Sequence, residues 1–316
     1  ENRMRKRELF ISVVLPLGKQ LVDRTYLDQL YKTLAAHYVT FEVVLAYDTT
    51  CALTPEVAQD ILQSYRSLRV VQLSGSNIVE SLIVAALEYV IGDVIVVASP
   101  YYDPVEMIPT LVQQVEDSQS MLIGQPESLN LGLVERLSRN MMYFLCRNLL
   151  AIPIVPHTSQ FMALNRSTAN SINQAKAKFR YFKTLAGIAL GGVRSFSYQP
   201  ANPEHRLRRP FHVSFKFALQ LILANSLRPL YVFGTLTFLT AVFDIGFAFL
   251  GASEMLPTVL LFNMAVAAST IAVVVAYLGH LVIEVQDRPP FFVVEVKDSI
   301  ERLDRQIRLN VVDRAK

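Results

Sequence analysis

Two kinds of apolar pattern divide the chain. Between residues 9 and 126, short runs of Val, Ile and Leu alternate with segments of helical periodicity. Runs that are apolar at nearly every position and end at turn residues are typical of parallel strands covered on both faces. The expected strands are 9–17, 41–48, 69–74, 93–99 and 120–126, and the expected helices between them are 21–37, 55–68, 77–91 and 104–117. The pattern predicts an α/β domain with a doubly wound, mostly parallel sheet.

Two long apolar segments follow, at 229–251 and 256–283. At ~1.5 Å per helical residue, each is long enough to cross the ~30 Å hydrocarbon core of a bilayer. Basic residues precede the first segment and follow the second, whereas the short loop 252–255 has none. The positive-inside rule then predicts an integral membrane protein whose soluble domain and both termini are cytoplasmic; in a bacterium this would be the inner or plasma membrane.

One ionisable residue, Asp244, lies inside the first apolar segment. A lone carboxylate is costly in lipid, so we expect Asp244 to face the second helix near Asn263, or a neighbouring subunit. A proton or ion path organised around Asp244 is the alternative, although little else in the sequence supports it.

Two further segments, 135–150 and 211–227, have a broad apolar face with Arg or Lys among their polar positions. This pattern favours helices that lie on a membrane surface over ordinary packed helices. The end of the chain predicts a strand and then a charged amphipathic helix. The predicted organisation is a cytoplasmic domain over 1–205 that includes the helix near 135–150, a juxtamembrane interfacial helix over 206–228, transmembrane helices over 229–251 and 256–283, and a cytoplasmic strand and helix over 284–316.

Composition narrows the class of protein. Hydrophobic residues make up 52% and charged residues 18%, which excludes a disordered chain. The net charge of +3 is too small to predict a nucleic-acid partner. Cys51 and Cys146 have neither the spacing of a zinc site nor the number needed for a disulfide framework. The sequence contains no GxGxxG and no GxxxxGK[ST] motif, so neither a classical dinucleotide site nor a P-loop is predicted.

The order of these segments resembles a known family. ISVVLPL, FEVVLAYDTT, the 70–107 segment and YLGHLVIEVQDRPPFFVVE are similar to successive segments of membrane-anchored family-2 glycosyltransferases of GT-A fold. These enzymes act on polyisoprenyl phosphates, as dolichyl-phosphate mannose synthases do. The resemblance implies transfer of a sugar from a nucleotide diphosphate to a lipid phosphate, with Mg²⁺ or Mn²⁺ neutralising the leaving group. It also implies homo-oligomers.

The resemblance places the family's metal-binding Asp-x-Asp on Ala98 and Pro100, neither of which can ligate a cation through its side chain. Asp103 is the only remaining metal candidate. The sequence Asp103-Pro104-Val105-Glu106 also reads as a helix capping box, with Asp103 as N-cap and Glu106 at the third helical position, and we favour this structural interpretation.

Other positions are weaker candidates. Pro16, Asp48 and Ser76 match nucleotide-binding positions, although the family's acidic pair on the second strand is reduced here to Tyr47 and Asp48. Near the acceptor the family tends to place an Asp, where this chain has His157 and Gln160. The candidate catalytic residues are therefore Asp103, His157 and Gln160.

Arg206, Arg208 and Arg209 form a basic cluster before the second interfacial segment. Arginine suits phosphate geometry, so this cluster is a candidate for binding lipid phosphate. Positive charge that only sets the membrane topology is an equally good interpretation.

The leading hypothesis is a glycosyltransferase-like membrane protein whose catalysis is lost or weakened. It would need no cofactor and would act as a structural, regulatory or lipid-phosphate-binding subunit, as a homo-oligomer or with another membrane protein. We expect aromatic side chains, Tyr47, Tyr101 and Tyr102, to fill part of the former pocket. The rival hypothesis is an active polyisoprenyl-phosphate glycosyltransferase that binds Mg²⁺ or Mn²⁺ through Asp48, Asp103 and Glu106.

Overall fold

The protein folds into two compact units. The computed structural model describes residues 7–18, 24–49, 51, 53–74, 79–118, 121–127, 132–150, 157–174, 193–205, 211–250, 256–286 and 291–299. The first unit comprises Glu1–Gly132, Val155–Arg208 and Pro289–Lys316, and the second comprises Leu133–Ile154 and Arg209–Arg288. The segment near 135–150 therefore belongs to the same unit as the long apolar helices, and the end of the chain belongs to the first unit.

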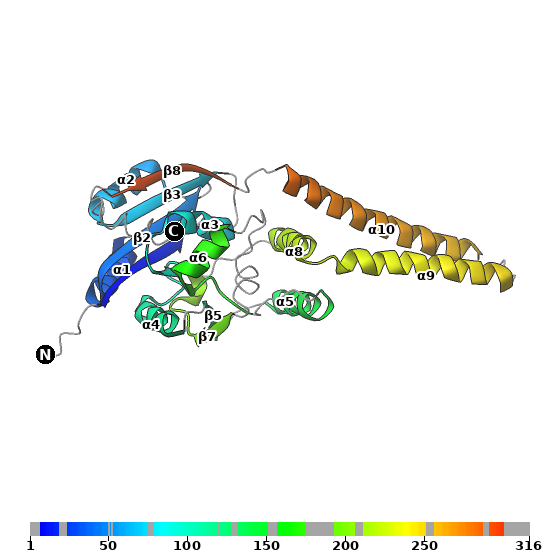
Figure 1. The fold of residues 1–316 in the computed structure, drawn as a ribbon, viewed down its shortest axis with the longest axis horizontal. Helices are drawn as coiled ribbons and strands as arrows, with labels where there is room; N and C mark the ends of the chain where they lie inside the picture. Colours follow the sequence, from blue (N-terminus) through cyan, green and yellow to red (C-terminus); the bar gives the residue numbers. More distant parts are fainter. Residues whose placement is uncertain are drawn as a thin grey trace. The chain divides into compact units, whose positions relative to one another are not determined.

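The first unit is built on a mixed sheet (Figure 1). Its strands in the described residues are β1 Arg7–Pro16, β2 Tyr38–Asp48, β3 Leu68–Ser74, β4 Val94–Val97, β5 Leu122–Pro126, β6 Met162–Asn165, β7 Arg194–Tyr198 and β8 Phe292–Asp298. Their order is β7-β5-β6-β4-β1-β2-β3-β8. The β1, β2, β3 and β4 strands are parallel to one another, as are β5 and β7, whereas β6 and β8 run antiparallel to their neighbours. The predicted α/β class with a mostly parallel sheet is confirmed.

Helices cover both faces of this sheet (Figure 1). They are α1 Arg24–His37, α2 Pro55–Ser64, α3 Val79–Tyr89, the short 3-10 helices η1 Val105–Met107 and η3 Pro203–His205, α4 Ile108–Ser118 and α6 Arg166–Gln174. Val13 and Leu15 pack with α1, α2 and α4, while Val14 packs with α3 and α6 on the other face. Because both faces are covered, the strands are apolar at nearly every position.

One helix is shorter than its pattern predicts. The helix expected over 55–68 ends at Ser64, and Tyr65 is already extended, with φ −120° and ψ 134°. Ser67 then has a φ of 53°. The reason is tertiary, since Leu68 is paired with Val43 in the sheet and cannot continue the helix.

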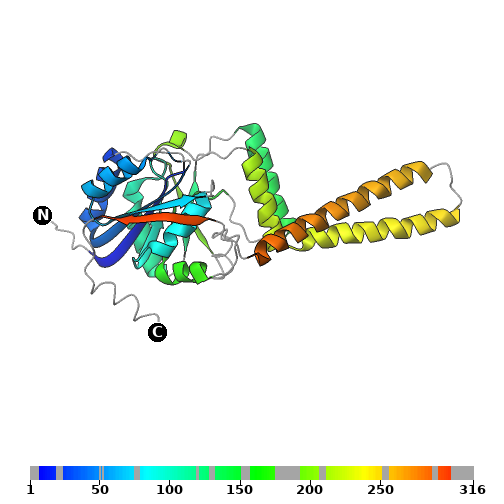
Figure 2. The same ribbon diagram turned by 90° about the horizontal axis from the view of Figure 1, so that it is seen from above.

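The last strand, β8, comes after the long apolar helices in sequence and pairs antiparallel with β3 (Figure 2). The predicted C-terminal strand is therefore confirmed. The amphipathic helix predicted to follow it lies outside the described residues.

The second unit is helical in the part that the structure describes. It contains α5 Leu133–Phe144, which continues into a π-helical turn, η2 Leu145–Leu149, together with α8 Phe211–Asn225, α9 Arg228–Leu250 and α10 Leu256–Val285. Within α9 and α10, residues 228–246 and 257–283 are long and apolar enough to cross a membrane, with mean hydropathies of 1.4 and 2.3. Both are almost entirely exposed.

Polar side chains join α9 and α10, which lie side by side (Figure 2). The Thr237 and Thr270 hydroxyls are 2.7 Å apart. Asn263 Nδ2 donates to Asp244 Oδ2 at 2.6 Å, so the prediction that Asp244 faces the second helix near Asn263 is confirmed. A carboxylate paired in this way costs less in lipid than an isolated one.

Candidate functional site

The carboxyl ends of the parallel strands define the candidate site. Pro16 at the end of β1 pairs with Ala46 of β2, and Val97 at the end of β4 pairs with Met162 at the start of the antiparallel β6. Pro16, Asp48, Ala98 and Gln160 therefore lie along one edge of the sheet, here called the carboxyl edge. In open α/β sheets, ligands bind beyond this edge.

Asp103, which follows β4 at the carboxyl edge, is held by the protein at both carboxylate oxygens. Its Oδ2 accepts a hydrogen bond from the Ser99 backbone N–H at 2.7 Å, and its Oδ1 accepts one from the Tyr198 hydroxyl at 2.5 Å. Burial and the neighbouring Asp103 charge raise the pKa of Tyr198, so its hydroxyl remains a donor. The result is a buried polar chain from Ser99 through Asp103 to Tyr198.

The prediction of a capping box at Asp103 is wrong, because the Asp103 side chain does not cap the following helix. The 3-10 helix η1 begins after Pro104, which occupies the cap position without any side-chain cap bond. Asp103 instead turns back toward Ser99, where it satisfies a buried backbone N–H as the chain leaves the sheet. Glu106 accepts a hydrogen bond from Gln29 on α1 at 2.7 Å.

The residues after β4 do not fit a divalent cation. Ala98 and Ser99 are buried at 1% and 4% exposure, and neither they nor Pro100 carries a carboxylate. Mg²⁺ and Mn²⁺ prefer carboxylate oxygens, and those of Asp103 already accept internal bonds. Among the residues that the structure describes, no three His, Cys, Asp or Glu side chains are grouped closely enough to hold a metal.

Aromatic side chains near the carboxyl edge pack inside the protein. Tyr47 and Tyr102 belong to the core, and burial is the main cause that raises the pKa of Tyr47. Tyr101 has a φ of 61°, and its ring centroid lies 5.0 Å from that of Tyr26. Beside Tyr47, Asp48 is buried at the end of β2.

Gln160, one of the two acceptor-side candidates, contacts a residue that the sequence did not single out. Its Nε2 donates to Glu80 Oε1 at 2.9 Å, and Glu80 is a buried residue in the first turn of α3. A Glu in the first helical turn is common because it interacts favourably with the helix dipole, so nothing in the sequence marked Glu80 as a site residue. His157 lies nearby in sequence with a φ of 58° and is half-buried.

The other predicted site residues have no described geometry. Ser76 and the basic cluster of Arg206, Arg208 and Arg209 lie outside the described residues. Their roles in binding nucleotide and lipid phosphate stay predictions.

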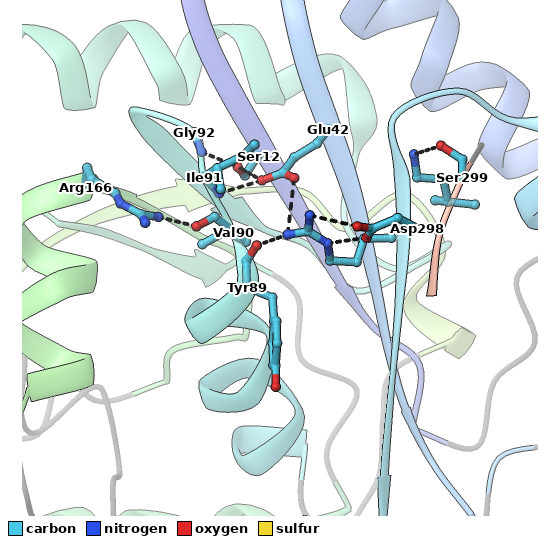
Figure 3. A network of polar contacts seen from close by, with 11 residues as sticks. Ser12, Glu42, Tyr89, Val90, Ile91, Gly92, Arg166, Asp298 and Ser299 are labelled. Atoms are coloured by element: carbon cyan, nitrogen blue, oxygen red, sulfur yellow. Dashed lines mark hydrogen bonds and ion pairs between the residues drawn. The ribbon is translucent and has the colours of Figure 1, made fainter. Parts of the chain in front are cut away.

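The opposite edge of the sheet carries a second buried polar network (Figure 3). Glu42 of β2 accepts hydrogen bonds from the Ser12 hydroxyl at 2.6 Å and from the Ile91 backbone N–H at 2.7 Å. Burial raises the pKa of Glu42, while these two bonds and the Arg69 charge oppose the rise. Because this network lies where β4 begins, away from the carboxyl edge, we assign it to the scaffold.

Arg69 of β3 connects that network to β8. Its guanidinium lies 3.8 Å from Glu42 and 2.6 Å from Asp298, and it also donates to the Tyr89 carbonyl. The Ser299 hydroxyl in turn accepts from the Leu68 backbone N–H at 3.2 Å. The strand that follows α10 is therefore bound to the sheet by side chains as well as by its backbone ladder.

Comparisons with known proteins give one relative of nearly the same length. The chain is 24% identical over 303 residues to an uncharacterised glycosyltransferase of Synechocystis sp., covering 90% of this chain and 95% of the relative. No family model matches the chain.

Among solved structures, the Mycobacterium tuberculosis glucosyl-3-phosphoglycerate synthase in complex with Mn²⁺, UDP and phosphoglyceric acid aligns with a TM-score of 0.46 at 16% identity, covering 68% of this chain and 77% of that one. A structure described as a mycobacterial protein aligns with a TM-score of 0.44 at 17% identity, covering 68% and 73%.

Proposed function

We propose that this chain is a membrane-anchored, glycosyltransferase-like protein whose own sugar transfer is lost or severely weakened. It serves as a structural, regulatory or lipid-phosphate-binding subunit in the assembly of lipid-linked sugars. Similarity to a protein named as a glycosyltransferase over 90% of the chain supports the glycosyltransferase-like part. The observation that carries the loss of catalysis is the bonding of Asp103, whose two carboxylate oxygens are bound to Ser99 and Tyr198.

The physical argument concerns the leaving group. When a sugar leaves a nucleotide diphosphate, negative charge develops on the diphosphate, and a metal ion or fixed cationic groups must stabilise it by several kcal/mol. The β4 end offers Ala98, Ser99 and Pro100, and the carboxylate that follows them, that of Asp103, already accepts hydrogen bonds from Ser99 and Tyr198. Among the residues that the structure describes at the end of β4, none supplies that stabilisation.

Membrane anchoring is supported by α9 and α10, which are long, apolar and exposed. The lipid-phosphate part of the proposal is based on the basic cluster Arg206, Arg208 and Arg209. Replacing all three by Gln should reduce binding of the purified chain to nanodiscs that contain polyprenyl phosphate, compared with nanodiscs that lack it. Equal binding of wild type and variant would remove this part of the proposal.

The main test is a transfer assay on the purified full chain in lipid nanodiscs. Undecaprenyl or dolichyl phosphate is supplied with Mg²⁺ or Mn²⁺ and a panel of radiolabelled nucleotide sugars. We expect no labelled lipid above the protein-free background. Metal-dependent labelling of the lipid by any donor would disprove the loss of catalysis.

An active enzyme with a remodelled site is the second candidate, because Asp48 is also buried at the carboxyl edge. It requires that a nucleotide with Mn²⁺ raises the melting temperature of the chain. That rise should vanish in Asp103→Ala and persist in Tyr198→Phe, which removes one internal bond of Asp103 but keeps its carboxylate. Our proposal expects no rise with Mn²⁺ in wild type or either variant.

A further inference from the structure

A buried amide oxygen at the carboxyl edge lacks a partner among the residues that the structure describes. Gln160 donates to Glu80 through Nε2, but its Oε1 is buried and accepts no hydrogen bond. A buried acceptor without a donor costs about 1–3 kcal/mol. Such atoms are rare in folded proteins and call for an explanation.

The position of this oxygen is set by three elements. Gln160 precedes β6, so its neighbour Met162 pairs with Val97 at the end of β4. Glu80 lies in the first turn of α3, and its carboxylate fixes the amide through the 2.9 Å bond. The adjacent Ser159 is held by the Gly124 carbonyl, toward which both its backbone N–H and its hydroxyl point. The Gln160 amide is therefore positioned by rigid neighbours at the edge where ligands bind in α/β sheets.

The chemistry of the pair defines the class of ligand. A Gln160 oxygen backed by the Glu80 carboxylate offers acceptors, so it selects a group that donates hydrogen bonds. A divalent cation prefers carboxylate oxygens, and Glu80 Oε1 already accepts a hydrogen bond from Gln160. A hydroxyl group donates a hydrogen bond to one acceptor, which is what the single Gln160 Oε1 offers.

We infer that Glu80 and Gln160 form a binding subsite for a hydroxyl group of a sugar, with Gln160 Oε1 as acceptor and Glu80 as the residue that orients it. This inference rests on the proposed glycosyltransferase-like function for its choice of a sugar, and it assigns the carboxyl edge a binding role that survives the loss of transfer. The sugar can be free, attached to a nucleotide or attached to a lipid phosphate, and its hydroxyl makes the same contact in each of these three ligands.

The test uses the full chain in nanodiscs and compares probes in pairs that differ only by the sugar. The pairs are UDP-glucose against UDP, GDP-mannose against GDP, and polyprenyl-phosphate glucose against polyprenyl phosphate, with free glucose and mannose added. Dissociation constants are measured by isothermal titration or by saturation-transfer NMR. We expect at least one sugar-bearing probe to bind about tenfold more tightly than its sugar-free counterpart, which is about 1.4 kcal/mol.

Gln160→Met, which keeps length but removes the amide, should abolish that tenfold difference. Glu80→Gln, which preserves volume and an acceptor oxygen, should reduce it with little effect on the fold. Asn173→Leu is the matched control, since Asn173 is another amide with a buried, unpaired oxygen, bonded through Nδ2 to Leu87, two turns along α3 from Glu80. It should leave the sugar-dependent difference intact. Ligand-free melting curves report whether each variant folds.

The outcomes separate this inference from the proposed function. If no probe binds better than its sugar-free counterpart, or if Gln160→Met and Glu80→Gln both bind as wild type, the subsite is disproved while the absence of transfer can still hold. If the sugar binds through Gln160 and is also transferred to the lipid, the subsite stands and the loss of catalysis is disproved.

Discussion

Single carboxylates have different roles at the two edges of the sheet. Glu42 and Asp103 are both 2% exposed, yet Glu42 binds β1, β2 and the start of β4 into the scaffold, whereas Asp103 at the carboxyl edge accepts hydrogen bonds from Ser99 and Tyr198. Both accept hydrogen bonds from backbone N–H groups. A buried carboxylate with such partners contributes to stability only while the partners remain in place.

The stability of the first unit should depend on pH through Glu42. Its pKa is raised in the folded state, so folding is favoured most below the unfolded value of about 4.3, and this contribution is lost as the pH rises through the folded pKa. In Glu42→Gln that titration is absent. We expect the melting temperature of the variant to be lower overall but to fall less than that of wild type between about pH 4.5 and about pH 7. Parallel pH profiles for the two proteins would contradict the assignment.

Gly92 should tolerate no side chain. A Cβ at this position would lie 2.6 Å from both the backbone N and the Oγ of Ser12, and 2.9 Å from the Phe10 carbonyl oxygen. Two of these three atoms are backbone, so the strand itself would have to shift. Gly92→Ala should destabilise the protein by about 1–3 kcal/mol, measured by chemical denaturation. Gly234→Ala is the control, because nothing lies within 4 Å of a Cβ there.

At the scale of elements, α5 has two apolar faces. Met142 and Cys146 pack together with Ile222 of α8. The opposite face has the exposed side chains Leu133, Leu137, Met141 and Phe144, which are 60–85% exposed and recur at helical spacing. Arg136 and Arg147 on the same helix are exposed as well. A soluble protein seldom exposes such a stripe, and basic residues beside it are typical of helices on anionic membranes.

A tryptophan placed on this stripe should enter the membrane surface. The chain has no Trp, so Leu137→Trp introduces the only indole. In nanodiscs we expect its emission to shift to the blue and to be quenched by brominated lipid, since α5 would lie in the headgroup region. Glu135→Trp, at an exposed position on the other side of the helix, should stay accessible to aqueous iodide. Iodide quenching at both positions would place the stripe in water.

On the scale of the whole molecule, β8 pairs with β3 although α9 and α10 lie between these two strands in the sequence. Arg69 bridges Glu42 and Asp298 here with only 13% of its side chain exposed. By contrast, Glu295 on the same strand pairs with Lys297 near the surface.

Asp298→Asn should therefore lower the stability of the first unit, whereas Glu295→Gln should not. Because Asp298 itself is half exposed, we expect a loss of about 1 kcal/mol, or a fall of a few degrees in melting temperature. Surface pairs such as Glu295–Lys297 contribute little. The melting temperatures of both variants are measured in the same nanodiscs. An equal fall in both would show that the Arg69–Asp298 contact does not stabilise β8.

Features that depend on residues close together in the sequence could be predicted, whereas features that depend on distant residues could not. Strands and long helices are encoded in local runs of apolar residues, so their existence could be predicted, and the Asp244–Asn263 contact followed from the cost of charge in lipid. The end of α2 at Ser64 could not be predicted from local sequence, because the pairing of Leu68 in the sheet imposes it.

The candidate site was harder to predict for the same reason. Asp103 bonds a tyrosine 95 residues away, and Gln160 bonds a glutamate 80 residues away. Neither partner has a local pattern that marks it, and only the sheet order brings them together.

The pairing of β8 with β3 also has a consequence for biosynthesis. The ribosome delivers β8 only after both long helices, so the outer edge of β3 stays open until the hairpin has been made. If α9 and α10 both cross a bilayer, the two crossings return β8 to the side on which β3 lies. A chain in which one helix failed to insert would leave β8 on the wrong side and its sheet unfinished. In that case the antiparallel pairing of β8 with β3 requires that both helices insert.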